Sequence, residues 1–407
     1  MSVSTVATHI EPFGVRVVPA ALGLAILMVS ARWAPVLGFW WAMGLGMGFA
    51  IQRARLCFAA SFRDLFVNGR GELMRAVLLG LIVATTAFAA QMARMVPDPS
   101  TGELVPKIHV WPLGANVLVG GLLFGLGMVL AGGCVSGTLW RIGEGYVGSL
   151  VALGGILLGL EAAAFSWNWW WENSMSTAPR IWLPHTLGYM GAWISVLAAL
   201  AMLYLLTYWW EARRAGPEIP VPGRPQPPLV TFQDRLRALW NRLFVQAWPA
   251  SAAAVALALL NVTAFAFDHP LGVTGELSAW SSRTFGLLGL YPNHLEGLDQ
   301  FSGCNLVDAP PGLLTNTFML DVGLVFGAFA ASVMASEFKI RLPRRPVRYL
   351  QSAVGGTVMG YGAGIALGCT IGAFFSAIPS LGLNGWLFGL GLLGGAFVGS
   401  RIIRRLA

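Results

Sequence analysis

The sequence predicts an all-α polytopic membrane protein, and three observations support this fold class. Hydrophobic residues make up 56% of the 407 residues. Charged residues make up only 11%, against about 25% in soluble globular proteins. The net charge of +8 is carried largely by short loops between apolar runs, which is typical of membrane orientation rather than of nucleic-acid binding. We therefore expect membrane lipid as the surroundings and no nucleic acid as a partner.

Long apolar runs predict about ten membrane segments, because a crossing helix needs about 20 mostly apolar residues. The N-terminal run counts as the first segment, since no compact basic stretch or obvious cleavage site precedes it. The second segment is short for a full crossing. The ten expected segments are residues 16–33, 36–52, 75–96, 113–131, 146–166, 186–209, 247–267, 313–336, 349–367 and 384–400.

Basic residues predict the direction of these segments. They gather in residues 53–75, 211–242, 339–348 and 401–405. Ten segments that start from a cytoplasmic N-terminus place all four basic stretches on the cytoplasmic side, as the positive-inside rule requires. The weakly charged connections, residues 97–112, 167–185 and 268–312, then lie outside. We expect a multi-pass protein with both termini in the cytoplasm.

A proline-rich stretch divides the chain into two halves. Residues 1–209 form the predicted first transmembrane half and residues 247–407 the second. The linker, residues 210–246, contains EARRAGPEIPVPGRPQPPLV from Glu211, whose prolines exclude a helix and favour an extended connector. The amphipathic stretch TFQDRLRALWNRLF follows and is expected to lie along the inner membrane surface.

A gapless internal repeat relates the two halves. GGLLFGLGMVLAGGCVSGTL from Gly120 aligns with GGTVMGYGAGIALGCTIGAF from Gly355 at an offset of 235 residues, with eight of twenty positions identical. Five segments, an odd number, separate the two copies, so the copies run in opposite directions. We therefore predict two inverted five-segment repeats with broken or re-entrant helices, the architecture of many transporters. The glycines alone would also suit close helix packing, but a packing motif does not need the cysteine at one point of both copies.

Cysteines mark the expected site. Cys134 and Cys369 occupy the matched breaks of the repeat. Cys57 follows a polar cluster that interrupts an apolar run, and it belongs either to a surface helix held by snorkelling arginines or to a re-entrant segment that points it into the protein. Cys304 has no counterpart in the repeat, and we expect it to be a structural residue or an entrance residue.

Thiols on broken helices suit a small, soft anion that contains sulfur. A neutral thiol is a weak S–H donor that contacts a terminal sulfur without repelling an anion. The oxygens of such an anion would be met by backbone amides at helix N-termini and by hydroxyl groups. Arg141 would either add charge attraction or anchor the interface beside Glu144. The expected substrate-binding residues are Cys57, Cys134, Cys369, Gly133, Gly137, Gly368, Gly372, Ser136, Thr138, Thr370 and Arg141.

Other chemistry has little support in the sequence. No phosphate-binding GxxxxGK[ST] loop occurs, and the histidines and cysteines form no metal-ligand pattern, so we expect no metal, no cofactor and no catalytic residue. Glu161 and Asp321 lie within or at the edge of predicted segments. They would serve ion coupling or lie at the membrane interface, and the interface is the expectation we favour.

At these motifs the sequence resembles the YeeE/YedE family of bacterial sulfur transport membrane proteins. The resemblance lies in QRARLCF around Cys57, GGLLFGLGMVLAGGCVSGTLWRIGEG around Cys134 and GGTVMGYGAGIALGCTIGAFFSAI around Cys369. It implies an hourglass-shaped inverted-repeat fold in the inner membrane and a permease rather than an enzyme. It also implies that these three cysteines pass thiosulfate along a relay, with a separate cytoplasmic sulfurtransferase of the TusA type as a partner.

Two alternatives to thiosulfate uptake stay open. The chain looks longer than a compact member that takes up thiosulfate, and larger relatives are associated with selenium metabolism, so the cargo could be a selenium species or another sulfur compound. A different class of protein, an intramembrane sulfurtransferase, would carry sulfur as cysteine persulfides. That chemistry requires an ionised thiol, for which Arg53 or Arg55 near Cys57 could supply the charge.

Overall fold

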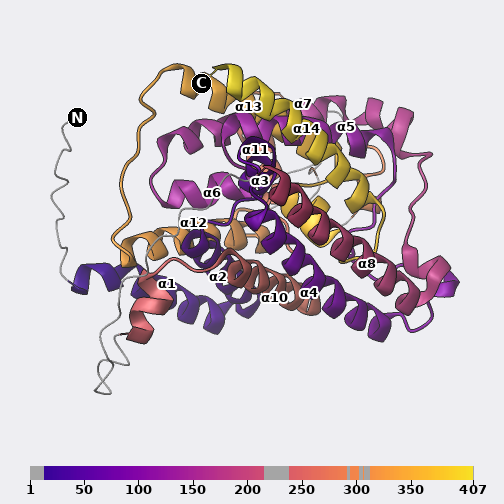
Figure 1. The fold of residues 1–407 in the computed structure, drawn as a ribbon, viewed down its shortest axis with the longest axis horizontal. Helices are drawn as coiled ribbons and strands as arrows, with labels where there is room; N and C mark the ends of the chain where they lie inside the picture. The colour runs from indigo at the N-terminus through magenta and orange to yellow at the C-terminus, as the bar shows by residue number, and fades with distance from the viewer. Residues whose placement is uncertain (1–12, 215–237, 291–293, 302–305, 307–311, 407) are drawn as a thin grey trace.

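The computed structural model describes residues 13–214, 238–290, 294–301, 306 and 312–406, and no β-strand occurs in this part of the chain (Figure 1). Cys304 lies outside these residues. The helices before the linker are α1 (Phe13–Trp33), α2 (Pro35–Ala54), α3 (Phe58–Val67), α4 (Glu72–Met95), α5 (Ala115–Ala131), α6 (Val135–Gly143), α7 (Val147–Trp170) and α8 (Leu183–Arg214), with the short segments η1 (Pro99–Thr101) and η2 (Trp171–Met175).

Long helices alternate with short helical segments after the linker as well. They are α10 (Ala250–Phe267), α11 (Thr274–Gly286), α12 (Asn316–Met334), α13 (Val347–Ile365) and α14 (Asn384–Leu406), with the short segments η3 (Asn241–Val245), η4 (Leu298–Gln300) and η5 (Thr370–Ser376). Helix α11 lies inside the connection 268–312, which we expected to be a loop. Its polar sequence, TGELSAWSSRTFG, hides it from a search for apolar runs.

Seven helices in the described part of the chain are long and apolar enough to cross a membrane. They are α4, α5 with α6, α7 with η2, α8, α10, α12 and α14. Helix α13 and η5 form an eighth candidate that is bent by 48° at a break. Each of our ten predicted segments overlaps a long helix, but α1 and α2 do not meet the same criteria, so the count of ten crossings stays a prediction.

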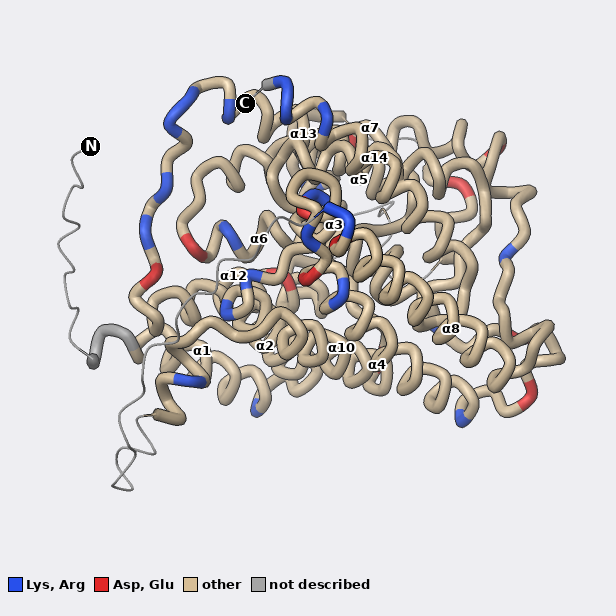
Figure 2. The backbone as a smooth tube through the Cα atoms, viewed as in Figure 1, with Lys and Arg blue, Asp and Glu red and all other residues tan. Residues whose placement is uncertain are grey.

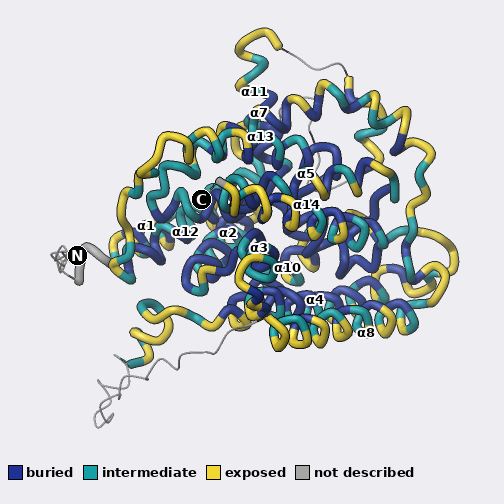
Figure 3. The backbone as a smooth tube through the Cα atoms, turned by 45° about the horizontal axis from the view of Figure 1, so that its top comes forward, coloured by how far each residue is buried: buried dark blue, intermediate teal, exposed yellow. Residues whose placement is uncertain are grey.

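Large apolar side chains cover the outside of the helix bundle. Helix α8 shows this best, since only 22% of its most apolar window is buried (Figure 3). Met190, Met202 and Leu205 are each more than 60% exposed on this helix. A soluble monomer rarely exposes such a continuous apolar surface, whereas lipid covers it in a membrane. The exposed surface therefore fits a multi-pass membrane protein.

The two repeated segments pack against each other as antiparallel helices. Glycines let the backbones of α5 and α13 touch: a Cβ atom on Gly120 would lie 2.7 Å from the Gly362 carbonyl, and one on Gly127 would lie 2.6 Å from the Gly355 carbonyl. These two contacts exchange under the offset of 235 residues, since Gly120 corresponds to Gly355 and Gly127 to Gly362. Reciprocal contacts of this kind are what a two-fold axis produces. They support the inverted repeat, which as a whole stays a prediction.

The basic stretches meet at one end of the molecule. The Trp210 indole donates to the Leu65 carbonyl, which ties the end of α8 to α3, and the Arg404 guanidinium donates to the Phe66 carbonyl, which ties the C-terminal helix to the same place. Figure 2 shows the basic residues between α12 and α13 at the same end of the view as the C terminus. These stretches therefore lie near one another, and the side of the membrane on which they lie stays a prediction.

The linker is described only in part. Helix α8 runs to Arg214, beyond the predicted end at residue 209, and residues 215–237 lie outside the described residues. The last part of the predicted amphipathic stretch forms helical residues 238–240 and η3. The division into residues 1–209, 210–246 and 247–407 stays a prediction.

Candidate substrate site at three buried cysteines

Three cysteines occupy equivalent local positions in the fold. Cys57, Cys134 and Cys369 are each at most 1% exposed. Each adopts extended backbone immediately before a helical segment: α3, α6 and η5, respectively. The first amides of a helix have no partner within the helix and carry partial positive charge. Each thiol therefore lies at the positive end of a helical segment, and the burial of Cys57 favours the inward-pointing alternative over a surface helix.

The thiols of Cys57 and Cys134 lie side by side. A Cβ atom on Gly137 would be 3.3 Å from both sulfur atoms, so this glycine leaves open the space that the two thiols share. The Gly137 amide donates to Cys134 Sγ at 3.4 Å, and the Ser136 hydroxyl lies 3.4 Å from the same sulfur. The two thiols are therefore direct neighbours inside the protein.

Thr370, from the second repeat, lies at the pair of thiols in the first half. Its side chain lies beside Cys134, and its hydroxyl has no hydrogen bond of normal geometry among the described residues. Gly368 precedes Cys369 where the backbone is tight, since a Cβ atom there would lie 3.1 Å from the Ala373 nitrogen. The two cysteine segments, 235 residues apart in sequence, therefore meet at Cys134 and Thr370.

Arg141 belongs to the cysteine loop rather than to an ion pair with Glu144. Its guanidinium donates to the Gly132 carbonyl and lies 3.4 Å from the Cβ position of Gly133. Its charge acts on Cys57. Glu144 instead accepts a hydrogen bond from Gln52 at 2.7 Å. The geometry therefore favours charge attraction over interfacial anchoring as the role of Arg141.

Thr138 and Gly372 make hydrogen bonds that involve backbone carbonyl groups. The Thr138 hydroxyl donates to the Cys134 carbonyl at 2.9 Å, within the first turn of α6. The Gly372 carbonyl lies 3.1 Å from His109 Nδ1. Of the expected hydroxyl groups, those of Ser136 and Thr370 are the ones that lie beside a thiol.

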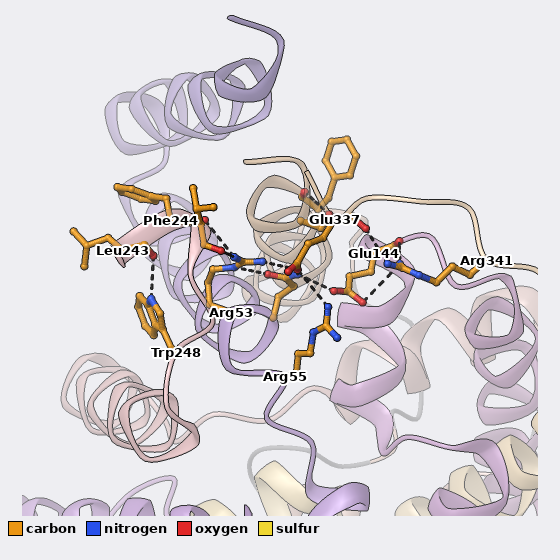
Figure 4. A network of polar contacts seen from close by, with 12 residues as sticks. Arg53, Arg55, Glu144, Leu243, Phe244, Trp248, Glu337 and Arg341 are labelled. Atoms are coloured by element: carbon orange, nitrogen blue, oxygen red, sulfur yellow. Dashed lines mark hydrogen bonds and ion pairs between the residues drawn. The ribbon is translucent and has the colours of Figure 1, made fainter. Parts of the chain in front are cut away.

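Arg53 and Arg55, which we considered as the source of charge for an ionised Cys57, are paired elsewhere (Figure 4). The Arg53 guanidinium bonds Glu337 at 2.7 Å and donates to the Val245 carbonyl at 2.9 Å, and Arg55 lies 3.6 Å from the same carboxylate. Arg53 is nearly fully buried, so its charge needs these partners. This network joins α2 and η3 to the segment that follows α12, at the end of the molecule that carries the basic stretches.

Two buried side chains at the site were missed in the sequence. Trp140 Nε1 lies 4.0 Å from the Cβ position of Gly137 and has no hydrogen-bond partner among the described residues. His109 is fully buried, stacks on Trp111 with ring centroids 4.8 Å apart, and holds the Gly372 carbonyl. Burial lowers the pKa of His109 to about 3. A tryptophan and a histidine inside apolar sequence give no pattern that marks them as site residues.

Glu161 and Asp321 are both buried in the protein, at 4% and 0% exposure. Each lies on the inner side of a packed helix, Glu161 on α7 and Asp321 on α12. Burial inside the protein does not give the depth of a side chain in the membrane, so the interfacial position stays a prediction. Glu161 accepts a hydrogen bond from the Ser281 hydroxyl at 2.8 Å.

A large apolar cavity of about 490 Å³ contains none of the cysteines in its lining. It is lined by residues of α3, α4, α8, α14 and η5, with Phe62, Leu78, Leu203, Phe374 and Leu390 among them. Apolar walls offer no partners for the oxygens of an anion. We therefore assign the candidate anion site to the cysteines and not to this cavity. No group of three potential metal ligands occurs in the described residues.

Membrane-length helices packed around a buried group of thiols are the architecture of a membrane transport protein. The model of the sulphur transport family matches residues 53–398, and the chain belongs to this family, which agrees with our predictions of the YeeE/YedE family and of a transport protein rather than an enzyme.

The chain is similar to curated proteins with transporter names. It is 30% identical over 364 residues to the thiosulfate transporter TsuA of Spirochaeta thermophila, covering 85% of this chain and 92% of that protein. It is 28% identical over 344 residues to TsuA of Escherichia coli, covering 84% and 88%. The probable transporter YedE of Escherichia coli is 34% identical over 209 residues, half of this chain and 49% of that protein.

Proposed function

We propose that this protein takes up thiosulfate across the bacterial inner membrane and passes it along Cys57, Cys134 and Cys369. The observation that carries this proposal is the shared space beside Gly137, where two thiols lie next to each other and the second cysteine segment arrives through Thr370. The similarity to thiosulfate transporters over most of both chains supports the same cargo.

The chemistry of thiosulfate fits these groups. Its terminal sulfur is soft and accepts weak S–H hydrogen bonds, so a neutral thiol holds it without charge repulsion. Its oxygens accept hydrogen bonds from the indole N–H of Trp140 and from helix N-terminal amides, and the charge of Arg141 attracts the anion. The thiol contacts are weak, and weak contacts at several successive positions let an anion leave as readily as it binds.

The orientation of the protein in the membrane is argued from the basic stretches. We place the end of the molecule that holds α3, η3 and the C-terminal helix in the cytoplasm, together with both termini. A separate TusA-type sulfurtransferase, as the acceptor of the anion, would meet this face. Binding of such a protein to the purified transporter, measured with and without thiosulfate, tests this part of the proposal.

The cargo is tested by uptake and competition. Purified protein in proteoliposomes should take up sulfur-labelled thiosulfate, and unlabelled thiosulfate should compete far better than sulfate, sulfite or selenite. Sulfate is the matched control, because it keeps the charge and size of thiosulfate and lacks the soft sulfur. Stronger competition by selenite or sulfite would assign the cargo to the selenium or other sulfur alternative.

The intramembrane sulfurtransferase alternative makes a different prediction. A persulfide enzyme keeps an added sulfur on a cysteine after substrate has left. Mass spectrometry of the protein after exposure to thiosulfate and gel filtration should therefore find Cys57 without added mass. A stable increase of one sulfur atom on Cys57 would favour the sulfurtransferase over the permease.

A further inference from the structure

Asp321 is a carboxyl group buried without a partner. It lies near the start of α12, and its side chain is fully inaccessible to solvent. Neither carboxyl oxygen has a hydrogen-bond partner among the residues that the structure describes. An ionised carboxylate is very costly in such a place, because nothing replaces the water that stabilised its charge. In this conformation the side chain is therefore held as the neutral acid.

Glu276, on the neighbouring helix α11, has the hydrogen-bond partners that Asp321 lacks. It is also buried, but both its oxygens are occupied. The four side chains around them, at 2.6 to 3.5 Å, are Thr315, Thr317, Trp280 and Arg283. These donors and the guanidinium satisfy both oxygens of Glu276, whereas neither oxygen of Asp321 has a partner among the described residues. Of these two neighbouring carboxyl groups, Asp321 is the one that nothing in the described part of the chain holds in place.

Asp321 also lies close to the proposed path. Its carboxyl group interacts electrostatically with Glu276 and with Cys369. Helices α1, α2 and α6 also pack against α12. Arg32 of α1 is exposed, and Arg141 of α6 donates to the Gly132 carbonyl. Arg53 of α2 bonds Glu337 beyond the other end of α12, and Glu144, which follows α6, joins the same network through Gln52. A charge that appears on Asp321 is therefore felt at the third cysteine.

We propose that Asp321 is a proton-binding site that couples inward movement of the anion to inward movement of a proton. This inference rests on the proposed transport of thiosulfate. A dianion enters a cell against an inside-negative potential, and each proton carried with it lowers by one the negative charge that crosses. In the closed state Asp321 holds its proton. When the site opens to the cytoplasm, water reaches the carboxyl group and the proton leaves with the anion.

The test measures thiosulfate movement and its coupling to protons in separate assays. Proteoliposomes that hold the wild type, Asp321→Asn or Glu161→Gln are assayed twice with labelled thiosulfate. The first assay is exchange at equal pH and equal thiosulfate on both sides. The second is uptake driven by an acidic outside, with the potential clamped at zero by valinomycin and potassium. Glu161→Gln is the matched control, because it removes another buried acid that already has a hydrogen-bond partner.

We expect wild type and Glu161→Gln to accumulate more thiosulfate under the pH gradient, up to about tenfold per pH unit for one proton per cycle. Asp321→Asn should keep exchange within about twofold and lose the response to the gradient, and Asp321→Glu should restore part of it. A gradient response that persists in Asp321→Asn overturns the proposal.

A measurement on the wild type alone covers the case in which Asp321→Asn fails to fold. Addition of thiosulfate outside vesicles loaded with a pH-sensitive dye should acidify their interior. Thiosulfate exchange without acidification and without a gradient response overturns the coupling and leaves the proposed function intact. No thiosulfate exchange at all overturns the proposed function and, with it, this inference.

Discussion

Gly137 keeps open the space between two thiols. We expect Gly137→Ala to lower thiosulfate uptake by at least about tenfold, since the new methyl group would lie 3.3 Å from both sulfur atoms and a tenfold loss needs only about 1.4 kcal/mol. Uptake by proteoliposomes at equal protein content measures the effect. Gly154→Ala is the control, because a Cβ atom there meets open space. Equal uptake by both variants would contradict a role for this space.

His109 predicts how stability depends on pH. Its pKa of about 3 is far below the value of about 6.5 in an unfolded chain, so the unfolded state binds the extra proton first. The contribution of this histidine is complete above pH 6.5 and falls by about 1.4 kcal/mol for each pH unit between 6.5 and 3. The melting temperature in detergent should therefore fall on acidification, and less steeply in His109→Gln. An equal slope in the two proteins would contradict this role.

The roles of single residues were predictable only where the sequence repeats them. Cys134 and Cys369 could be identified because they stand at one point of two aligned segments. Trp140, His109 and Asp321 have no such counterpart, and their importance depends on burial and on missing partners. Both of these are properties of the packed structure. The same holds for Arg53, whose partner Glu337 lies 284 residues away.

The pairing of α5 with α13 depends on glycines, and this predicts a sharp response to one methyl group. A Cβ atom on Gly127 would lie 2.5 Å from the Met359 nitrogen and 2.6 Å from the Gly355 oxygen. These are backbone atoms, so the helices must separate. We expect Gly127→Ala to destabilise the protein by about 1–3 kcal/mol, whereas Gly154→Ala should be neutral. Thermal unfolding in detergent compares them, and an unchanged midpoint in Gly127→Ala would contradict close packing at this point.

Long helices were predicted well and short ones poorly. The run expected at residues 113–131 is the helix Ala115–Ala131, and its end at the Gly-Cys break followed from the sequence. Helices α3 and α6 are ten and nine residues long, shorter than any crossing segment. Hydropathy finds segments that face lipid, and these helices face protein. Cys57 and Cys134 immediately precede these two helices. Hydropathy therefore predicts the membrane segments but not the short helices beside the candidate site.

The distribution of basic residues predicts which loops face the cytoplasm and which face the outside. Chemical labelling of cysteines placed in these loops tests that prediction. Cys304→Ala leaves Cys57, Cys134 and Cys369, which are all buried. In this variant we expect an added Lys107→Cys to react with an impermeant maleimide in right-side-out vesicles. Arg344→Cys should react only after the vesicles are opened. Lys107 is half exposed and Arg344 is exposed, so burial does not explain a difference. Labelling of Arg344→Cys in intact vesicles would reverse the proposed orientation.

Charge also sets the energy of transport. Moving a dianion inward against an inside-negative potential costs about 4.6 kcal/mol per 100 mV, twice the cost for one charge. The thiols and amides of the site lower the barrier for the anion but supply none of this energy. A transporter that accumulates thiosulfate therefore needs a coupled ion, and Asp321 is the group that the structure offers for it.

The most direct test of the cysteine path is uptake of sulfur-labelled thiosulfate by proteoliposomes that hold four single variants. We predict that Cys57→Ala, Cys134→Ala and Cys369→Ala lose uptake while they fold and express as the wild type does, and that Cys304→Ala retains it. Uptake at the wild-type rate in both Cys134→Ala and Cys369→Ala would contradict passage of the anion along these thiols.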